Sequence, residues 1–150
     1  MQRESVWLAV AKKGHMGVSV PEAVEEALCF GWIDSTANKL DEKRYKLLLA
    51  PRKRNSAWSK INKARVAKLI KKKLMQPAGL AMIKLAKKTG TWKLLDDVDK
   101  LKCPGDLAKA LNSSKKGKAF FDAFPPSAKK QILYWLQSAK TVETRNKRIK

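Results

Sequence analysis

The sequence predicts an α+β fold that is mostly α, with several helices packed around one small β-hairpin and a C-terminal group of short helices. Three observations support this expectation. Several segments of the 150-residue chain repeat apolar residues at helical spacing. Two short apolar stretches, 31–35 and 45–50, flank the polar turn 38–43 and indicate a hairpin. Prolines and serines recur from Cys103 onward and limit the helices there to short lengths.

The first hundred residues are predicted to form one domain that begins with a strand and a helix. The stretch Trp7–Ala11 is short and apolar, which favours a strand that ends before Gly14. The stretch Ser19–Glu22 is typical of a helix start, because it combines a capping residue, a proline and a glutamate. Gly31 is expected to end this helix and lead into the hairpin.

Two longer helices are expected to complete this domain. Ser56 is the predicted N-cap of the first, which runs to about Leu74. Its apolar side chains gather on one half and most of its cations on the other, so the helix is amphipathic. Pro77 opens the second helix, which continues to about Lys88 and is closed by Gly90.

Residues 101–150 are expected to form a helical region packed on the first domain. Pro104 and Pro126 mark the starts of two of its helices. The helix from Pro126 has the most regular apolar spacing in the chain, and Trp135 falls on its apolar face. Trp135→Ala is therefore expected to damage folding. Residues 141–150 either form a final basic helix or fray.

Net charge is the strongest functional signal in the composition. The chain has 34 Lys and Arg against 13 Asp and Glu, a formal charge of +21, and no acid occurs from Lys43 to Leu95. Such a field favours an anionic macromolecule, which could be nucleic acid, anionic lipid at a membrane surface or an acidic protein. The alternative is a solvated lysine face that only keeps the protein soluble. The candidate anion-binding residues are Arg52, Lys53, Arg54, Lys60, Arg65, Lys68, Lys71 and Lys72.

Several other kinds of site find no support. Two cysteines, Cys29 and Cys103, are too few for a disulfide framework. A single histidine, His15, and the absence of metal-ligand spacing argue against zinc, and no cofactor is expected. No apolar run approaches the roughly 20 residues of a membrane helix, and no signal peptide pattern is present. We therefore expect a cytoplasmic protein.

Asp34 is the one residue of the hairpin region that suggests chemistry. It could act as a general base, or it could form a structural ion pair with Arg52 across the end of the hairpin. The ion pair is the favoured interpretation, because no second acid, histidine or Ser-His arrangement accompanies Asp34. The neighbouring Trp32 and Trp58 are expected to pack in the core.

A series of motifs follows in order along the chain. They are Ala27–Asp34, Pro51-Arg52, Ser56-x-Trp58-Ser59-x-x-Asn62, Met75-x-Pro77-Ala78-Gly79-Leu80, Pro104-x-Asp106-Leu107, Phe121-Asp122-Ala123 and Glu143-Thr144-Arg145. Together they resemble the bacteriocin-protection family, also called the YdeI/OmpD-associated family, over most of residues 4–150. The resemblance implies a role in resistance to bacteriocins or antimicrobial peptides, and it brings no catalytic residues with it.

The sequence thus favours a non-enzymatic stress or defence protein that resembles the bacteriocin-protection family and binds an anionic partner. A sequence-nonspecific nucleic-acid-binding module that contacts phosphates is the first alternative. An enzyme that uses Asp34 is the second.

Overall fold

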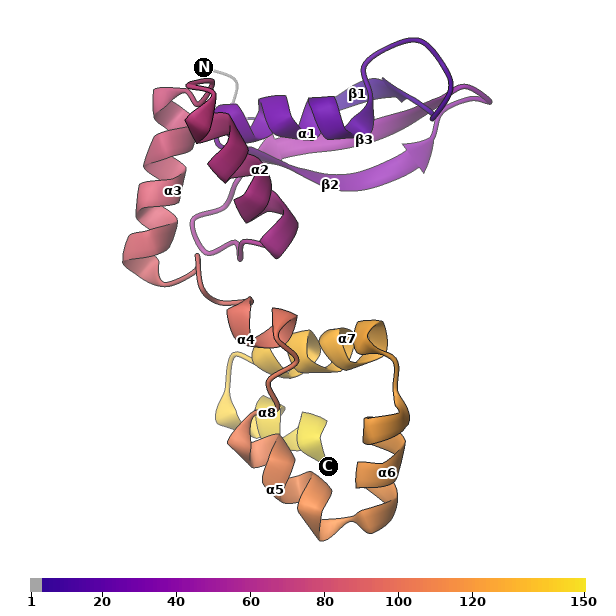
Figure 1. Ribbon diagram of the computed structural model, residues 1–150, viewed down its shortest axis with the longest axis vertical. Helices are drawn as coiled ribbons and strands as arrows, with labels where there is room; N and C mark the ends of the chain where they lie inside the picture. Colours follow the sequence, from indigo (N-terminus) through magenta and orange to yellow (C-terminus); the bar gives the residue numbers. More distant parts are fainter. Residues whose placement is uncertain (1–3) are drawn as a thin grey trace. The chain divides into compact units, whose positions relative to one another are not determined.

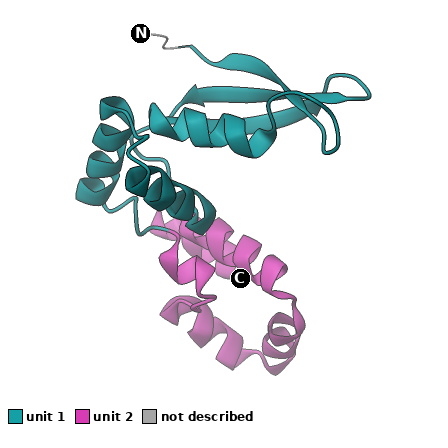
Figure 2. Ribbon diagram, turned by 45° about the horizontal axis from the view of Figure 1, so that its top comes forward, with its two compact units in different colours: residues 1–94 teal, residues 95–150 magenta. Residues whose placement is uncertain are grey.

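The computed structural model describes residues 4–150, and the chain divides after Leu94 into two compact units (Figure 2). The described residues form eight helices and one three-stranded antiparallel sheet (Figure 1). The predicted α+β, mostly α class is therefore confirmed.

The first unit contains the sheet, whose strands are β1 (Val6–Ala11), β2 (Trp32–Lys39) and β3 (Arg44–Pro51). Strands β2 and β3 form the predicted hairpin, and β1 pairs antiparallel with the other side of β3, so the spatial order is β1-β3-β2. The turn between β2 and β3 is held by Asp41, which accepts a 2.9 Å hydrogen bond from the Lys43 backbone. The sheet thus has one strand more than the hairpin.

Helix α1 (Val20–Cys29) lies along one face of the sheet (Figure 1). Its start is a capping box, in which Ser19 and Glu22 satisfy each other's backbone N–H groups. Its end requires glycine, because Gly31 adopts φ 77° and a Cβ there would lie 2.9 Å from the Met82 side chain. The capping residues and Gly31 therefore set both ends of the helix, as the sequence predicts.

Helices α2 (Lys60–Lys71) and α3 (Pro77–Thr89) complete the helical part of this unit. The predicted N-cap at Ser56 is wrong by three residues. Ser59 is the N-cap, since its hydroxyl accepts a 3.3 Å hydrogen bond from the Asn62 backbone. Ser56 instead lies in a turn, where its backbone N–H bonds to the Lys53 carbonyl.

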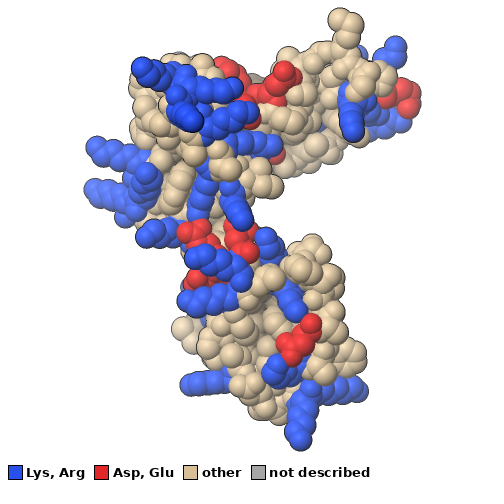
Figure 3. All heavy atoms as spheres, viewed as in Figure 1, with Lys and Arg blue, Asp and Glu red and all other residues tan. Residues whose placement is uncertain are grey.

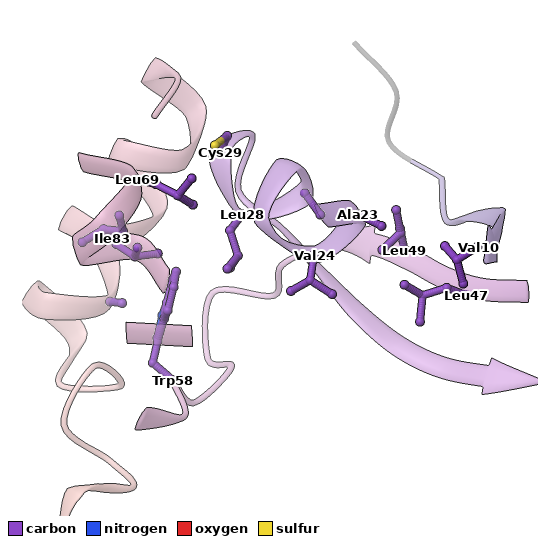
Figure 4. Packing of buried hydrophobic residues seen from close by; sticks show 13 residues of the cluster. Val10, Ala23, Val24, Leu28, Cys29, Leu47, Leu49, Trp58, Leu69 and Ile83 are labelled. Carbon is purple, nitrogen blue, oxygen red and sulfur yellow. The ribbon is translucent and has the colours of Figure 1, made fainter. Parts of the chain in front are cut away.

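The core of the first unit runs from the sheet across α1 to α2 and α3 (Figure 4). Strand residues Val10, Leu47 and Leu49 cover one side of α1 and are buried. On the helical side, Leu28 of α1 and the fully buried Trp58 belong to the same cluster as the buried residues of α2 and α3. Packing of this cluster fixes the loop that holds Trp58.

The second unit contains five helices: α4 (Asp96–Asp99), α5 (Gly105–Ser113), α6 (Lys115–Ala123), α7 (Pro126–Gln137) and α8 (Val142–Ile149). Its core consists of Val98, Leu107, Leu133 and Leu136. The basic C-terminal segment forms helix α8, with Thr141 as its N-cap. Arg145 of α8 donates to both oxygens of the Asp106 carboxylate, and this bonding lowers the pKa of Asp106 to about 2.

The prediction that Trp135 is a core residue is wrong. Its side chain is 50% exposed, whereas Leu133 and Leu136 of the same helix are buried. The buried face of α7 is therefore rotated from the predicted one. Trp135 instead lies under the Arg148 guanidinium, which is 4.8 Å from the ring centroid.

Candidate anion-binding surface

Helix α2 separates its apolar and basic side chains onto opposite faces. Val66 and Leu69 are buried against the core of the first unit. Lys60, Lys68 and Lys71 project from the opposite side of the helix and are exposed. Burial of the apolar pair thus determines which way the lysines point.

We call the exposed lysines Lys60, Lys68, Lys71 and Lys72 the α2 basic face. On the side of the molecule drawn in Figure 3, Lys and Arg side chains gather over α2 and α3. The loop before α2 adds Lys53 and Arg54, which are also exposed. Six of the eight predicted anion-binding residues are therefore exposed.

Two residues near this face have internal partners. Arg65 is half-buried, and its Nη1 donates a 3.0 Å hydrogen bond to the Asn62 side chain. Lys68 lies 3.7 Å from a Glu25 carboxylate oxygen on α1, with more than half of its side chain exposed. An exposed pair at this distance contributes little to stability, so Lys68 remains available to an external anion.

The structure places Arg52 in the core, away from the predicted surface. Only 6% of the residue is exposed, and its guanidinium carbon lies 3.8 Å from the centroid of the Trp58 ring. Its Nη2 donates to the Ala57 carbonyl, whereas Nε and Nη1 are buried without a hydrogen-bond partner. Burial lowers the pKa of Arg52 to about 10, and the charge of Asp34 partly opposes this effect.

Asp34 is half-buried in β2, opposite Leu49 of β3. Its negative charge raises the pKa of Arg52 from a distance. The Arg52 nitrogens form no direct ion pair with Asp34 in the described structure. The predicted ion pair is therefore replaced by a longer-range attraction. A β-bulge follows Asp34, where the register with β3 shifts before Ala37.

Two lysines outside the predicted anion-binding set lie at an aromatic ring. Trp92 packs against Trp58 with a centroid separation of 5.0 Å. The Nζ atoms of Lys63 and Lys87 lie 5.6 Å and 5.5 Å from the Trp92 centroid. Lys63 is one of the cations that helical spacing does not place on the basic half of α2, and its position at Trp92 explains this exception.

The described residues hold no cluster of three or more His, Cys, Asp or Glu side chains that could bind a metal ion. Within residues 4–150, no helix has both the length and the apolar character needed to span a bilayer.

Comparison with known families divides the chain into two parts. Residues 1–82 match the family described as "Domain of unknown function (DUF8412)". The chain belongs to this family. Members are defined by a domain without an assigned function, so membership by itself indicates no activity. Neither the curated proteins nor the solved structures yielded a match.

Residues 100–150 match the family described as "Bacteriocin-protection, YdeI or OmpD-Associated". This match confirms the predicted resemblance for residues 100–150. The matched range contains the C-terminal motifs, from Pro104 to Arg145. The motifs between Ala27 and Leu80 lie instead within the range of the first family.

Proposed function

We propose that this DUF8412 family member is a non-enzymatic protein of the bacteriocin-protection type that acts by binding an anionic polymer through the α2 basic face. One observation carries the proposal. Three exposed lysines share one side of α2, a fourth lies at its C-cap, two further cations precede the helix, and Glu25 is an acid that reaches this group. The description of the family matched by residues 100–150 supports the protective role.

The α2 basic face and the loop before it, with Lys53 and Arg54, together favour diffuse attraction over geometric recognition. Five of the six exposed cations are lysines, whose compact charges on flexible chains suit a phosphate or carboxylate in many orientations. Their charges lie close together without alternating acids. Binding of a polyanion to these cations therefore releases the counterions condensed on the polyanion, and this release favours the complex. The proposed partner is therefore a polymer with closely spaced negative charges.

A sequence-nonspecific nucleic-acid-binding module is the alternative function. The observation that favours it is Trp92, whose half-buried ring has two lysine ammonium groups beside it. Proteins that bind single-stranded nucleic acid commonly stack its bases on an aromatic ring that lies next to phosphate-binding cations. Such a module prefers a single strand to other polyanions of equal charge density.

The test measures binding of labelled duplex DNA, used as a polyanion, over a series of salt concentrations. If the six exposed cations each neutralise one phosphate, the slope of log K against log salt is about −5. The variant Lys60→Gln/Lys71→Gln/Lys72→Gln removes three charges and is expected to reduce the steepness of that slope by about 3. A flat salt response of the wild-type protein would contradict both binding functions.

A matched control separates the α2 basic face from net charge alone. Lys109, Lys115 and Lys116 are exposed lysines of the second unit, and replacing all three with Gln removes the same charge. We expect this control to retain most of the wild-type affinity, because its three lysines lie outside the α2 basic face and make no phosphate contact there. Equal losses in both triple variants would reject the α2 basic face as the site.

Competition experiments distinguish the two functions. Heparin and polyphosphate should displace the labelled DNA as effectively as unlabelled DNA if any polyanion suffices. A nucleic-acid module would instead favour single-stranded DNA over these competitors, and the preference would be lost in Trp92→Leu.

A further inference from the structure

A groove of about 970 Å³ opens between α1 and the sheet in the first unit. Every strand of the sheet contributes a side chain to it: Leu8 from β1, Leu49 from β3 and Trp32 from β2. Ala27 and Phe30 line it from α1. Its volume lies near the upper end of the range for ligand-binding pockets.

The walls of this groove are largely apolar and remain in contact with solvent. Leu8 and Trp32 are half-buried, and Phe30 is 44% exposed. Covering such side chains with an apolar molecule removes their surface from water, and this burial favours binding. The two aromatic rings offer the largest contact area. The groove therefore favours an occupant with an apolar body.

The charge of the groove is opposite to that of the chain as a whole. Glu22 and Glu26 belong to its lining, and none of its described lining residues is Lys or Arg, although Lys and Arg number 34 in the sequence. The Ser19 hydroxyl and backbone N–H donate hydrogen bonds of 2.7 Å and 2.9 Å to one carboxylate oxygen of Glu22. These bonds fix the position of the carboxylate and hold the pKa of Glu22 below its usual value, so it stays charged.

We propose that this groove binds a small apolar molecule that carries no negative charge. The apolar body covers Leu8, Leu49 and Phe30, and its polar group stays in solvent on the side of Glu22 and Glu26. An alcohol and an amine with the same apolar body share this chemistry, and the experiment below distinguishes them. This site is distinct from the α2 basic face and does not depend on the function proposed for that face.

Charge excludes anions from the groove. A carboxylate group on the ligand would lie beside Glu22 and Glu26 and would be repelled by both. Because both glutamates are exposed, solvent screens this repulsion, so apolar contact sets the affinity and charge sets the selectivity. The net charge of +21 has the opposite effect, since it attracts anions nonspecifically. Weaker binding of an anion than of its neutral analogue therefore reports on the groove and not on net charge.

The probes are phenylbutanol, phenylbutylamine and phenylbutanoate, which share one apolar body and differ in the head group. Heteronuclear NMR of the full-length protein follows the indole N–H signal of Trp32, which lines the groove, and a Trp32→Phe variant assigns this signal. Ligands of this size bind with dissociation constants on the order of 1 mM, which an NMR titration can measure. We expect the alcohol and the amine to bind, and the carboxylate to bind about fivefold more weakly than the alcohol.

Two variants test the lining. Glu22→Gln/Glu26→Gln keeps the capping box, because glutamine can replace glutamate in that motif. It is expected to raise the affinity for the carboxylate about fivefold and to leave the affinity for the alcohol unchanged. Phe30→Ala removes apolar contact area and is expected to weaken binding of the alcohol about fivefold. Glu25→Gln is the control for charge on α1, since Glu25 faces Lys68 and does not line the groove.

The outcomes are decisive in both directions. Discrimination against the carboxylate that is lost in Glu22→Gln/Glu26→Gln and kept in Glu25→Gln supports the proposal, and the tighter binder of the alcohol and the amine then identifies the polar group. The proposal is overturned if neither the alcohol nor the amine shifts the Trp32 signal, or if the carboxylate binds there as tightly as the alcohol. Equal effects of the two glutamate variants would also overturn it. Thermal unfolding of each variant checks that the fold is retained.

Discussion

At the scale of single residues, Arg52 shows how the environment changes the meaning of a charge. In the sequence it begins a run of three basic residues, Arg52 to Arg54, and has the appearance of a surface cation. In the structure its guanidinium stacks on Trp58 and is buried, while Lys53 and Arg54 are exposed. Its role is therefore to pack the loop between β3 and α2 against the core.

Variants at Arg52 separate its volume from its charge. Arg52→Ala is expected to lower the free energy of unfolding by about 2–4 kcal/mol, because it leaves a cavity over Trp58. Arg52→Met keeps most of the volume and removes a poorly paired buried charge, so it should stay within about 1 kcal/mol of wild type. Urea unfolding followed by tryptophan fluorescence measures both. An equally large loss in Arg52→Met would show that the charge itself is required.

At the scale of elements, the junction between α1 and α3 depends on one close backbone approach. A Cβ added at Gly79 would lie 2.2 Å from the Cys29 carbonyl oxygen. The same carbonyl accepts a 3.1 Å hydrogen bond from the Gln76 backbone at the start of α3. Glycine at position 79 thus allows the first turn of α3 to rest against the end of α1.

Gly79→Ala is expected to destabilise the protein by about 1–3 kcal/mol through this overlap. The sign of this stability change is informative. In a helix without such contacts alanine is favoured over glycine by about 1 kcal/mol, so the substitution would stabilise the protein. Gly105→Ala is the control, because a Cβ there meets nothing within 4 Å. It should be neutral or stabilising by up to about 1 kcal/mol. Stability gains in both variants, measured by thermal unfolding, would contradict the close approach.

Helix α7 offers a second comparison within one element. Leu136 is 1% exposed and belongs to the core of the second unit, whereas Trp135 is 50% exposed. Leu136→Ala is expected to lower the free energy of unfolding by about 2–5 kcal/mol. Trp135→Ala should cost less than about 1.5 kcal/mol, mainly the loss of its contact with Arg148. Circular dichroism of denaturant series measures both, and a larger loss at Trp135 would reverse the assignment of the buried face.

At the scale of the whole molecule, the net charge of +21 affects stability as well as binding. Most surface ion pairs in the described residues have exposed side chains, such as Lys39 with Glu42 and Lys102 with Asp97, and these pairs offset little of the repulsion. A folded chain brings its like charges closer together than an unfolded one. Folding therefore works against electrostatic self-repulsion.

Added salt is consequently expected to raise the melting temperature. Increasing NaCl from about 0.05 M to about 0.5 M shortens the Debye length from about 14 Å to about 4 Å and screens the repulsion. Differential scanning calorimetry measures the shift. The variant Lys60→Gln/Lys71→Gln/Lys72→Gln should respond less to salt than the wild type, because it begins with a lower net charge. A falling melting temperature would indicate that attractive ion pairs dominate.

The boundaries of most elements follow from local chemistry and could be predicted. Caps, prolines and glycines act on neighbouring residues, so the sequence shows where α1, α3 and α7 begin or end. These residues are the capping box at Ser19, the prolines at 77 and 126, and the glycines at 31 and 90. The same holds for the hairpin, whose strands are adjacent in the chain. Ser56 and Ser59 offer equivalent capping chemistry three residues apart, and only the structure shows that Ser59 is the cap.

The candidate site could be predicted only in part, because local chemistry is visible in the sequence and long-range packing is not. The acid-free stretch and the helical spacing of its lysines are sequence properties, and they mark the α2 basic face directly. Which cations are buried depends instead on residues far apart in the chain. Trp58 and the core around it enclose Arg52, and β1 joins the hairpin to leave a groove beside α1. Side-chain type and spacing thus establish local elements and charge, whereas long-range packing decides which residues meet the solvent.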